Sequence, residues 1–199
     1  ENQGEMGRCA IAVSANEPNW IYMIATKSSA LFGFYKSINS GASWTEVNDS
    51  EGAQYPNILS GQTYDGTGSG GQGSYDLCIS VHPNNADSIT VGGVNLYNSS
   101  DGGDTWDIIA HWVGNGWGYD ANNEWGSDAN YSTIPKVHAD HHGLTYAADG
   151  TLIIANDGGV YTSTNGSTFE NKSEGLFIGQ IYRLNVAQDQ DDLVVSGLQ

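Results

Sequence analysis

The sequence predicts an all-β protein, a β-propeller of four-stranded antiparallel blades with about three and a half blades and an incomplete ring. Three observations predict this fold. An eight-residue pattern occurs three times at nearly even spacing, and four short apolar or alternating segments surround each copy. In addition, 27 of the 199 residues are glycine, about twice the usual share of ~7%. Glycine and asparagine between short runs of Val, Ile, Tyr and Trp are typical of strands joined by tight turns.

The repeated pattern, called the octet below, predicts a hairpin turn. Residues 37–44 and 99–106 share the form S-x-[DN]-x-G-x-x-W, and residues 163–169 form a third copy that is one residue shorter and ends in Phe. The Asp or Asn side chain fixes the turn by accepting backbone N–H groups, and glycine supplies a positive φ. The aromatic ring is expected to start the next strand and pack beneath the turn. The predicted structural residues are Ser37, Asn39, Gly41, Trp44, Ser99, Asp101, Gly103, Trp106, Ser163, Asn165 and Phe169.

The spacing of the octets divides the whole chain, residues 1–199, into successive blades. We expect blade one at 8–47, an insertion at 48–75, blade two at 76–110, an insertion at 111–141, blade three at 142–175, and the start of a fourth blade at 176–199. Propellers typically contain ~4–8 blades. Closing the ring would therefore need further blades or a second copy of the chain.

The octets resemble the Asp-box (BNR) repeats of secreted bacterial propellers of the sortilin and xyloglucanase types. The segments 137–142, 156–163 and 196–199 share this resemblance, which extends over nearly the whole chain. It implies a propeller that is secreted or displayed at the cell surface. Because such propellers include enzymes, receptors and assembly factors, the resemblance implies the fold and leaves the function open.

Charge and cysteine content exclude several classes of protein. Six Lys and Arg residues against 23 Asp and Glu give a formal charge of −17, whereas nucleic-acid binding and attachment to anionic membranes both require basic surfaces. No apolar run reaches the ~18 residues of a membrane-spanning helix.

Cys9 and Cys78 are expected to stay reduced, because they belong to stacked sheets ~10 Å apart while a disulfide needs Cα atoms within ~7 Å.

The two long insertions are the predicted site of function. Both follow a fourth strand, so the topology places them on one face, opposite the octet turns, and long loops on a rigid scaffold often carry function. The first insertion is rich in Gly and Ser and is expected to be flexible. The second mixes aromatic residues with Gly, Asn and Asp, which suits sugar binding; alternatively, its rings form a small satellite core. The candidate ligand-binding residues are Trp112, Trp117, Tyr119, Trp125 and Tyr131.

A cluster of histidines ends the second insertion. Strand alternation would place His138, Asp140 and His142 on one side. Two imidazoles and a carboxylate suit a divalent cation, which would then be the cofactor. Alternatively, these side chains form a hydrogen-bonded structural cluster or take part in acid–base catalysis.

Our main hypothesis is an extracellular module that binds a polysaccharide or an extracellular protein through the face carrying the insertions. One alternative is a xyloglucanase-like glycoside hydrolase, which would need two carboxylates ~6.5–9.5 Å apart if it inverts configuration. A second alternative is a non-catalytic assembly factor. Catalytic residues cannot be assigned from the sequence, and the candidates are Asp140, Asp157 and Asp120.

Overall fold

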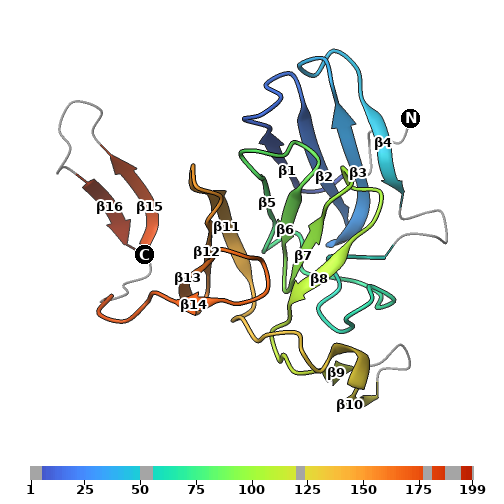
Figure 1. The fold of residues 1–199 in the computed structure, drawn as a ribbon, viewed down its shortest axis with the longest axis vertical. Helices are drawn as coiled ribbons and strands as arrows, with labels where there is room; N and C mark the ends of the chain where they lie inside the picture. The colour runs from blue at the N-terminus through green and yellow to red at the C-terminus, as the bar shows by residue number, and fades with distance from the viewer. Residues whose placement is uncertain (1–5, 50–55, 120–123, 177–180, 187–193, 199) are drawn as a thin grey trace.

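The fold is three four-stranded antiparallel sheets in succession, each with its strands in chain order (Figure 1). The computed structural model describes residues 6–49, 56–119, 124–176, 181–186 and 194–198. Blade one contains β1 (Cys9–Val13), β2 (Ile21–Lys27), β3 (Ala30–Ser37) and β4 (Thr45–Asp49). Blade two contains β5 (Cys78–Val81), β6 (Ile89–Gly92), β7 (Leu96–Ser99) and β8 (Asp107–Ala110). Blade three contains β11 (His141–Tyr146), β12 (Leu152–Asn156), β13 (Gly159–Ser163) and β14 (Glu170–Asn171).

The all-β prediction is confirmed, since the described residues form strands and no α-helix. A further antiparallel pair, β15 (Ile181–Val186) and β16 (Val194–Leu198), follows blade three. The sequence did not predict the short hairpin of β9 (Trp117–Tyr119) and β10 (Trp125–Ser127), nor the 3-10 turn η1 (Ala129–Tyr131), all inside the second insertion. No helix in the described ranges is long and apolar enough to cross a membrane.

The blades pack face to face through their first strands, with β1 against β5 and β5 against β11. The larger core cluster joins blades one and two and includes the fully buried rings of Tyr22, Phe34 and Tyr97. A second cluster joins blades two and three around Leu96 and Ile154. Burying aromatic and branched side chains between sheets is the main source of stability in such a stack. It fixes the scaffold that carries the insertions.

Each octet forms the predicted turn between the third and fourth strands of its blade. In blade two, the Asp101 carboxylate accepts the backbone N–H of Thr105 (2.9 Å) and the Ser99 hydroxyl (2.8 Å). The N–H of Gly103 donates to the same Ser99 hydroxyl oxygen at 2.8 Å. Asn39 and Asn165 accept equivalent bonds in the other two octets. These side chains therefore serve the turn itself, as the pattern predicted.

The octet aromatics differ in burial. Trp106 is only 9% exposed and meets Phe34 of blade one edge to face, with ring centroids 5.1 Å apart. Phe169 packs against the cluster shared by blades two and three. Each of these rings thus lies against the preceding blade. Trp44 is 40% exposed because no described blade covers that face of blade one.

The two cysteines are free, as expected. Cys9 is exposed at the start of β1, whereas Cys78 is buried at the start of β5, where its thiol contacts the carbonyl oxygens of Gly92 and His141.

Candidate ligand-binding site on the insertion face

The two insertions lie against each other, as their topology predicted. The Tyr64 hydroxyl of the first donates to the carbonyl of Trp117 in the second at 2.9 Å. In the opposite direction, the indole N–H of Trp112 donates to the carbonyl of Gly61 at 2.9 Å. We call the surface formed by residues 56–75, 111–119 and 124–140 the insertion face.

The first insertion is folded over residues 56–75, so the expectation that it is flexible is wrong there; residues 50–55 lie outside the described part. Ile58 and Leu59 are buried in the main core, being 1% and 0% exposed. The Asn57 side chain accepts the N–H of Leu31 and donates to the carbonyls of Gly68 and Gly70. Two aliphatic residues anchor the segment despite its Gly and Ser content.

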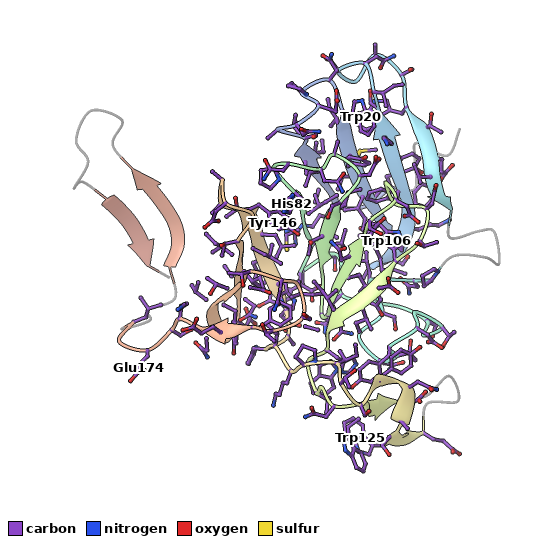
Figure 2. All side chains as sticks on the ribbon, in the orientation of Figure 1. Trp20, His82, Trp106, Trp125, Tyr146 and Glu174 are labelled. Atoms are coloured by element: carbon purple, nitrogen blue, oxygen red, sulfur yellow. The ribbon has the colours of Figure 1, made fainter. Side chains whose placement is uncertain are left out.

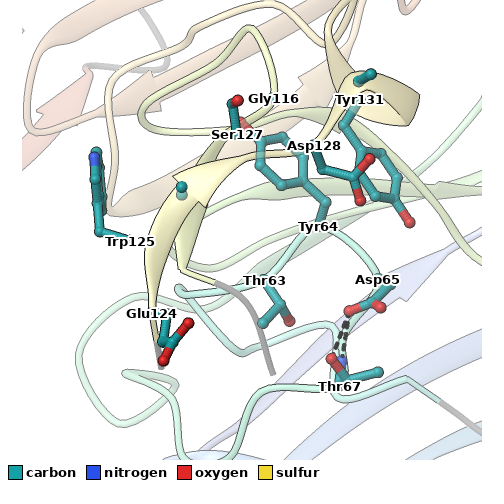
Figure 3. A pocket seen from close by; sticks show the side chains of 13 residues that line it. Thr63, Tyr64, Asp65, Thr67, Gly116, Glu124, Trp125, Ser127, Asp128 and Tyr131 are labelled. Atoms are coloured by element: carbon teal, nitrogen blue, oxygen red, sulfur yellow. Dashed lines mark hydrogen bonds between the residues drawn. The ribbon is translucent and has the colours of Figure 1, made fainter. Parts of the chain in front are cut away.

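A pocket of about 400 Å³ opens between the insertions (Figure 3). It lies beside the hairpin of β9 and β10 and is bordered on its other side by the first insertion. Its lining residues are Thr63, Tyr64, Asp65, Thr67, Gly116, Gly118, Glu124, Trp125, Gly126, Ser127, Asp128, Ala129 and Tyr131.

Three stacked rings support one wall of this pocket. The rings of His111 and Tyr64 lie 4.0 Å apart and 18° from parallel, and those of Tyr64 and Tyr131 lie 4.9 Å apart and 13° from parallel. Burial raises the pKa of Tyr64 to about 12, so its hydroxyl stays neutral. Burial also lowers the pKa of His111 to about 4, so its ring is neutral at physiological pH. The wall is thus a rigid aromatic surface without positive charge.

Carboxylates lie at the edges of the same wall. Asp65 accepts both the N–H and the hydroxyl of Thr67, at 3.0 and 2.7 Å. Burial opposes ionisation of Asp65, but these hydrogen bonds outweigh it and lower its pKa. The pKa of Tyr131 is raised by burial and then by the charges of Asp65 and Asp128, so both carboxylates act on this phenol. The pocket therefore combines flat apolar rings with fixed negative charge.

The predicted ligand-binding residues divide into three groups. Trp125 and Tyr131 line the pocket. Trp112 is half-buried, and its ring centroid lies 6.4 Å from that of Trp125. This packing of one ring near another is what the satellite-core alternative predicted. Trp117 is 49% exposed beside the pocket, and the side chain of Tyr119 lies outside the described residues.

The sequence analysis did not assign Tyr64 or Asp65 to a ligand-binding site. Both belong to the insertion that was expected to be flexible. The signal was present as Thr63-Tyr64-Asp65, a short group of aromatic and polar residues within a Gly-rich background. Placing it opposite Tyr131 required the tertiary structure.

The backbone of the histidine cluster is not regular strand throughout. Asp140 has a φ of +64°, and the pairing of β11 with β12 is irregular between His141 and Gly143. His141 is buried and donates its Nδ1–H to the Gly93 carbonyl at 2.8 Å, while His142 Nε2 lies 2.8 Å from a carboxylate oxygen of Asp157. In the ranges that the structure describes, no group of three His, Cys, Asp or Glu side chains is arranged to hold a metal ion, so His138, Asp140 and His142 do not form one.

Two carboxyl groups meet where the first strands of blades two and three begin. Asp76 stands two residues before β5 and Asp140 stands directly before β11. Asp76 is fully buried, neither of its oxygens accepts a hydrogen bond from a donor in the described residues, and its carboxyl contacts that of Asp140. Burial and then the charge of Asp140 raise the pKa of Asp76 to about 7, while Arg8 acts weakly in the opposite direction. Asp76 therefore keeps its proton to a much higher pH than an exposed carboxyl does.

The other two catalytic candidates, Asp157 and Asp120, do not belong to this buried pair. Asp157, in the turn between β12 and β13, accepts the Tyr75 hydroxyl at 3.1 Å in addition to its contact with His142. These three side chains are partly exposed. Asp120 lies outside the described residues. Neither Asp140 nor Asp157 lines the pocket between the insertions.

Comparisons with known proteins give similarity of fold at low sequence identity. YCF48 from Cyanidioschyzon merolae is 15% identical, with a TM-score of 0.46 over 83% of this chain and 36% of that one. A GH74 xyloglucanase from Xanthomonas campestris is 16% identical, with a TM-score of 0.37 over 80% of this chain and 29% of that one. An ancestral GH74 enzyme is 18% identical, with a TM-score of 0.36 over 82% and 23% of the two chains. No family model matches the chain, and no curated protein matches it. The chain spans about a quarter to a third of the length of these three structures.

Proposed function

We propose that this chain is a carbohydrate-binding propeller module, secreted or displayed at the cell surface, whose ligand occupies the pocket between the insertions. The observation that carries the proposal is the composition of that pocket. It joins the Tyr64 and Tyr131 rings to hydroxyls and carboxylates from two separate insertions. Saccharides present apolar ring faces together with many hydroxyl groups, which need both kinds of surface.

The size and rigidity of the site support binding. A volume of about 400 Å³ falls within the ~300–1,000 Å³ range of small-molecule sites. Tyr64 is held by its hydrogen bond to Trp117 and by stacking on His111, so the wall is preformed. Preformed sites avoid part of the entropic cost of binding. Trp125, 49% exposed at the edge, offers a further ring to a longer chain of sugars.

Hydrolysis is less well supported than binding. Glycosidases pair an ionised carboxylate with a second carboxyl of raised pKa, and both must reach the scissile bond. Among the described residues, the carboxyl with a raised pKa is Asp76, which is completely buried and does not line the pocket. Within the pocket, Asp65 has a lowered pKa and so cannot serve as the acid.

A glycan array followed by calorimetry tests this function. We expect Tyr131→Ala to abolish or strongly weaken binding to the glycans retained by the unmodified protein, because the exposed part of the ring wall is lost. Trp44→Ala is the matched control, since it removes an exposed aromatic ring from a blade outside the insertion face. Equal binding by all three proteins, or binding to no glycan at all, would contradict the proposal.

A further inference from the structure

The charged side chains among the described lining residues of the pocket are all carboxylates. Asp65, Glu124 and Asp128 line it, and the lining residues that the structure describes include no Lys, Arg or His. Figure 3 shows these three carboxylates on different sides of Tyr64 and Tyr131. The formal charge of the chain, −17, adds to the local negative potential. An anionic sugar would therefore be repelled from this site.

The negative charge is concentrated beside aromatic rings. Asp65 and Asp128 both act on the Tyr131 phenol, and Asp65 is held ionised by its two hydrogen bonds from Thr67. Carboxylates next to aromatic faces are the surroundings that favour an organic ammonium group, through charge-assisted hydrogen bonds and cation–π attraction. The described residues provide no three-ligand metal arrangement, so a cation carried by the ligand fits better than a bound metal ion.

We propose that the pocket selects saccharides that carry a protonated amine, such as 2-amino sugars, over neutral saccharides with the same ring. This inference rests on the proposed carbohydrate-binding function and specifies its ligand class. The ammonium group lies between Tyr131 and the carboxylates of Asp65 and Asp128, while the sugar ring lies against the aromatic wall.

Three ligands that differ at one position test the inference. The β-1,4-linked hexamers of glucose, N-acetylglucosamine and glucosamine have the same backbone and carry a hydroxyl, an acetamide or an amine at C2. Calorimetry at about pH 6 keeps the amine largely charged. A charge-assisted hydrogen bond predicts that the glucosamine hexamer binds about tenfold or more tightly than the glucose hexamer.

Two variants separate a local effect from general attraction between opposite charges. Asp128→Asn keeps the size of the side chain and an oxygen that accepts the Asn130 N–H, but removes one charge beside Tyr131. We expect it to reduce the preference for the amine to a few-fold. Asp104→Asn is the matched control: it changes the formal charge of the chain by the same amount on the exposed octet turn of blade two, and should keep the preference.

The outcomes distinguish this inference from the function on which it rests. Tighter binding of the amine that is lost in Asp128→Asn and kept in Asp104→Asn supports the inference. Equal affinity for the glucose and glucosamine hexamers, or equal losses in the two variants, overturns it, while binding sensitive to Tyr131→Ala would leave the proposed function standing. Absence of binding to all three hexamers together with binding of other glycans on the array also overturns it. Failure to bind any glycan overturns both.

Discussion

The buried pair of Asp76 and Asp140 makes the stability of the protein depend on pH, and Asp76→Asn should remove that dependence. In the native state, burial and the charge of Asp140 raise the pKa of Asp76 from 3.8 to about 7. Between these two pH values, the native state holds a proton that the unfolded chain has released. The free energy of unfolding therefore falls as pH rises from about 4 to 7, then levels off.

The size of the effect follows from the two pKa values. A rise from 3.8 to about 7 corresponds to about 4 kcal/mol over the full range, since each pH unit represents about 1.4 kcal/mol for one proton. Between pH 5 and 7 the expected loss is about 2 kcal/mol, and above pH 7 it is less than about 1 kcal/mol. The amide introduced by Asp76→Asn cannot ionise. The free energy of unfolding of this variant should therefore vary little over the same pH range.

Urea unfolding at about pH 5, 6, 7 and 8 measures this difference. Asp140→Asn should flatten the profile as well, because it removes the charge that opposes ionisation of Asp76, and asparagine tolerates the φ of +64° at this position. Asp157→Asn is the control, as this carboxylate is partly exposed and contacts Tyr75 and His142. If the Asp76→Asn profile keeps the slope of the unmodified protein, the carboxyl pair is not the titrating group and the reasoning is refuted.

Three further predictions concern the blades and the pocket. Asp101→Ala should lower the free energy of unfolding by about 1–2 kcal/mol, because the Thr105 N–H and the Ser99 hydroxyl lose their acceptor; unchanged urea unfolding would contradict this. Trp106→Ala should cost about 3–5 kcal/mol and Trp44→Ala less than about 1 kcal/mol, so similar shifts in melting temperature would refute the assigned difference in burial. Tyr64→Phe should keep the ring stack but lose the hydrogen bond to Trp117, costing about 1 kcal/mol and weakening ligand binding by calorimetry; full affinity would show that this bond does not organise the pocket.

Features determined by short-range chemistry could be predicted from the sequence. The octet contains its own hydrogen-bond acceptors and its own glycine, so a turn forms in all three blades, including the third, where the octet is one residue shorter and the glycine N–H reaches back three residues rather than four. The strands follow because the apolar runs between turns have only one way to pair. The grouping of the two insertions followed from blade topology alone.

Features that depend on a neighbouring element could not be predicted in this way. Trp44 and Trp106 occupy the same octet position, yet only Trp106 has a preceding blade to pack against in the described structure. The composition of the first insertion favours flexibility, but Ile58 and Leu59 are buried in the main core and hold the segment against the blades.

The arrangement of the histidine cluster and of the Asp76–Asp140 pair could not be predicted from the sequence either. Alternation along a strand assumes extended backbone throughout, and the positive φ of Asp140 breaks that assumption. The contact of Asp140 with Asp76 joins residues 64 positions apart in the chain. Neither residue carries a local signal of its partner, so the pairing appears only once blades two and three are stacked.

The most direct test of the account is a crystal structure of the protein with the glycan that binds most tightly in the array. The account predicts saccharide density in the pocket between the insertions, with a sugar ring against Tyr131 and polar contacts to Asp65 or Asp128. Density on the octet turns, or beside Tyr75, His142 and Asp157 with the pocket empty, would contradict it.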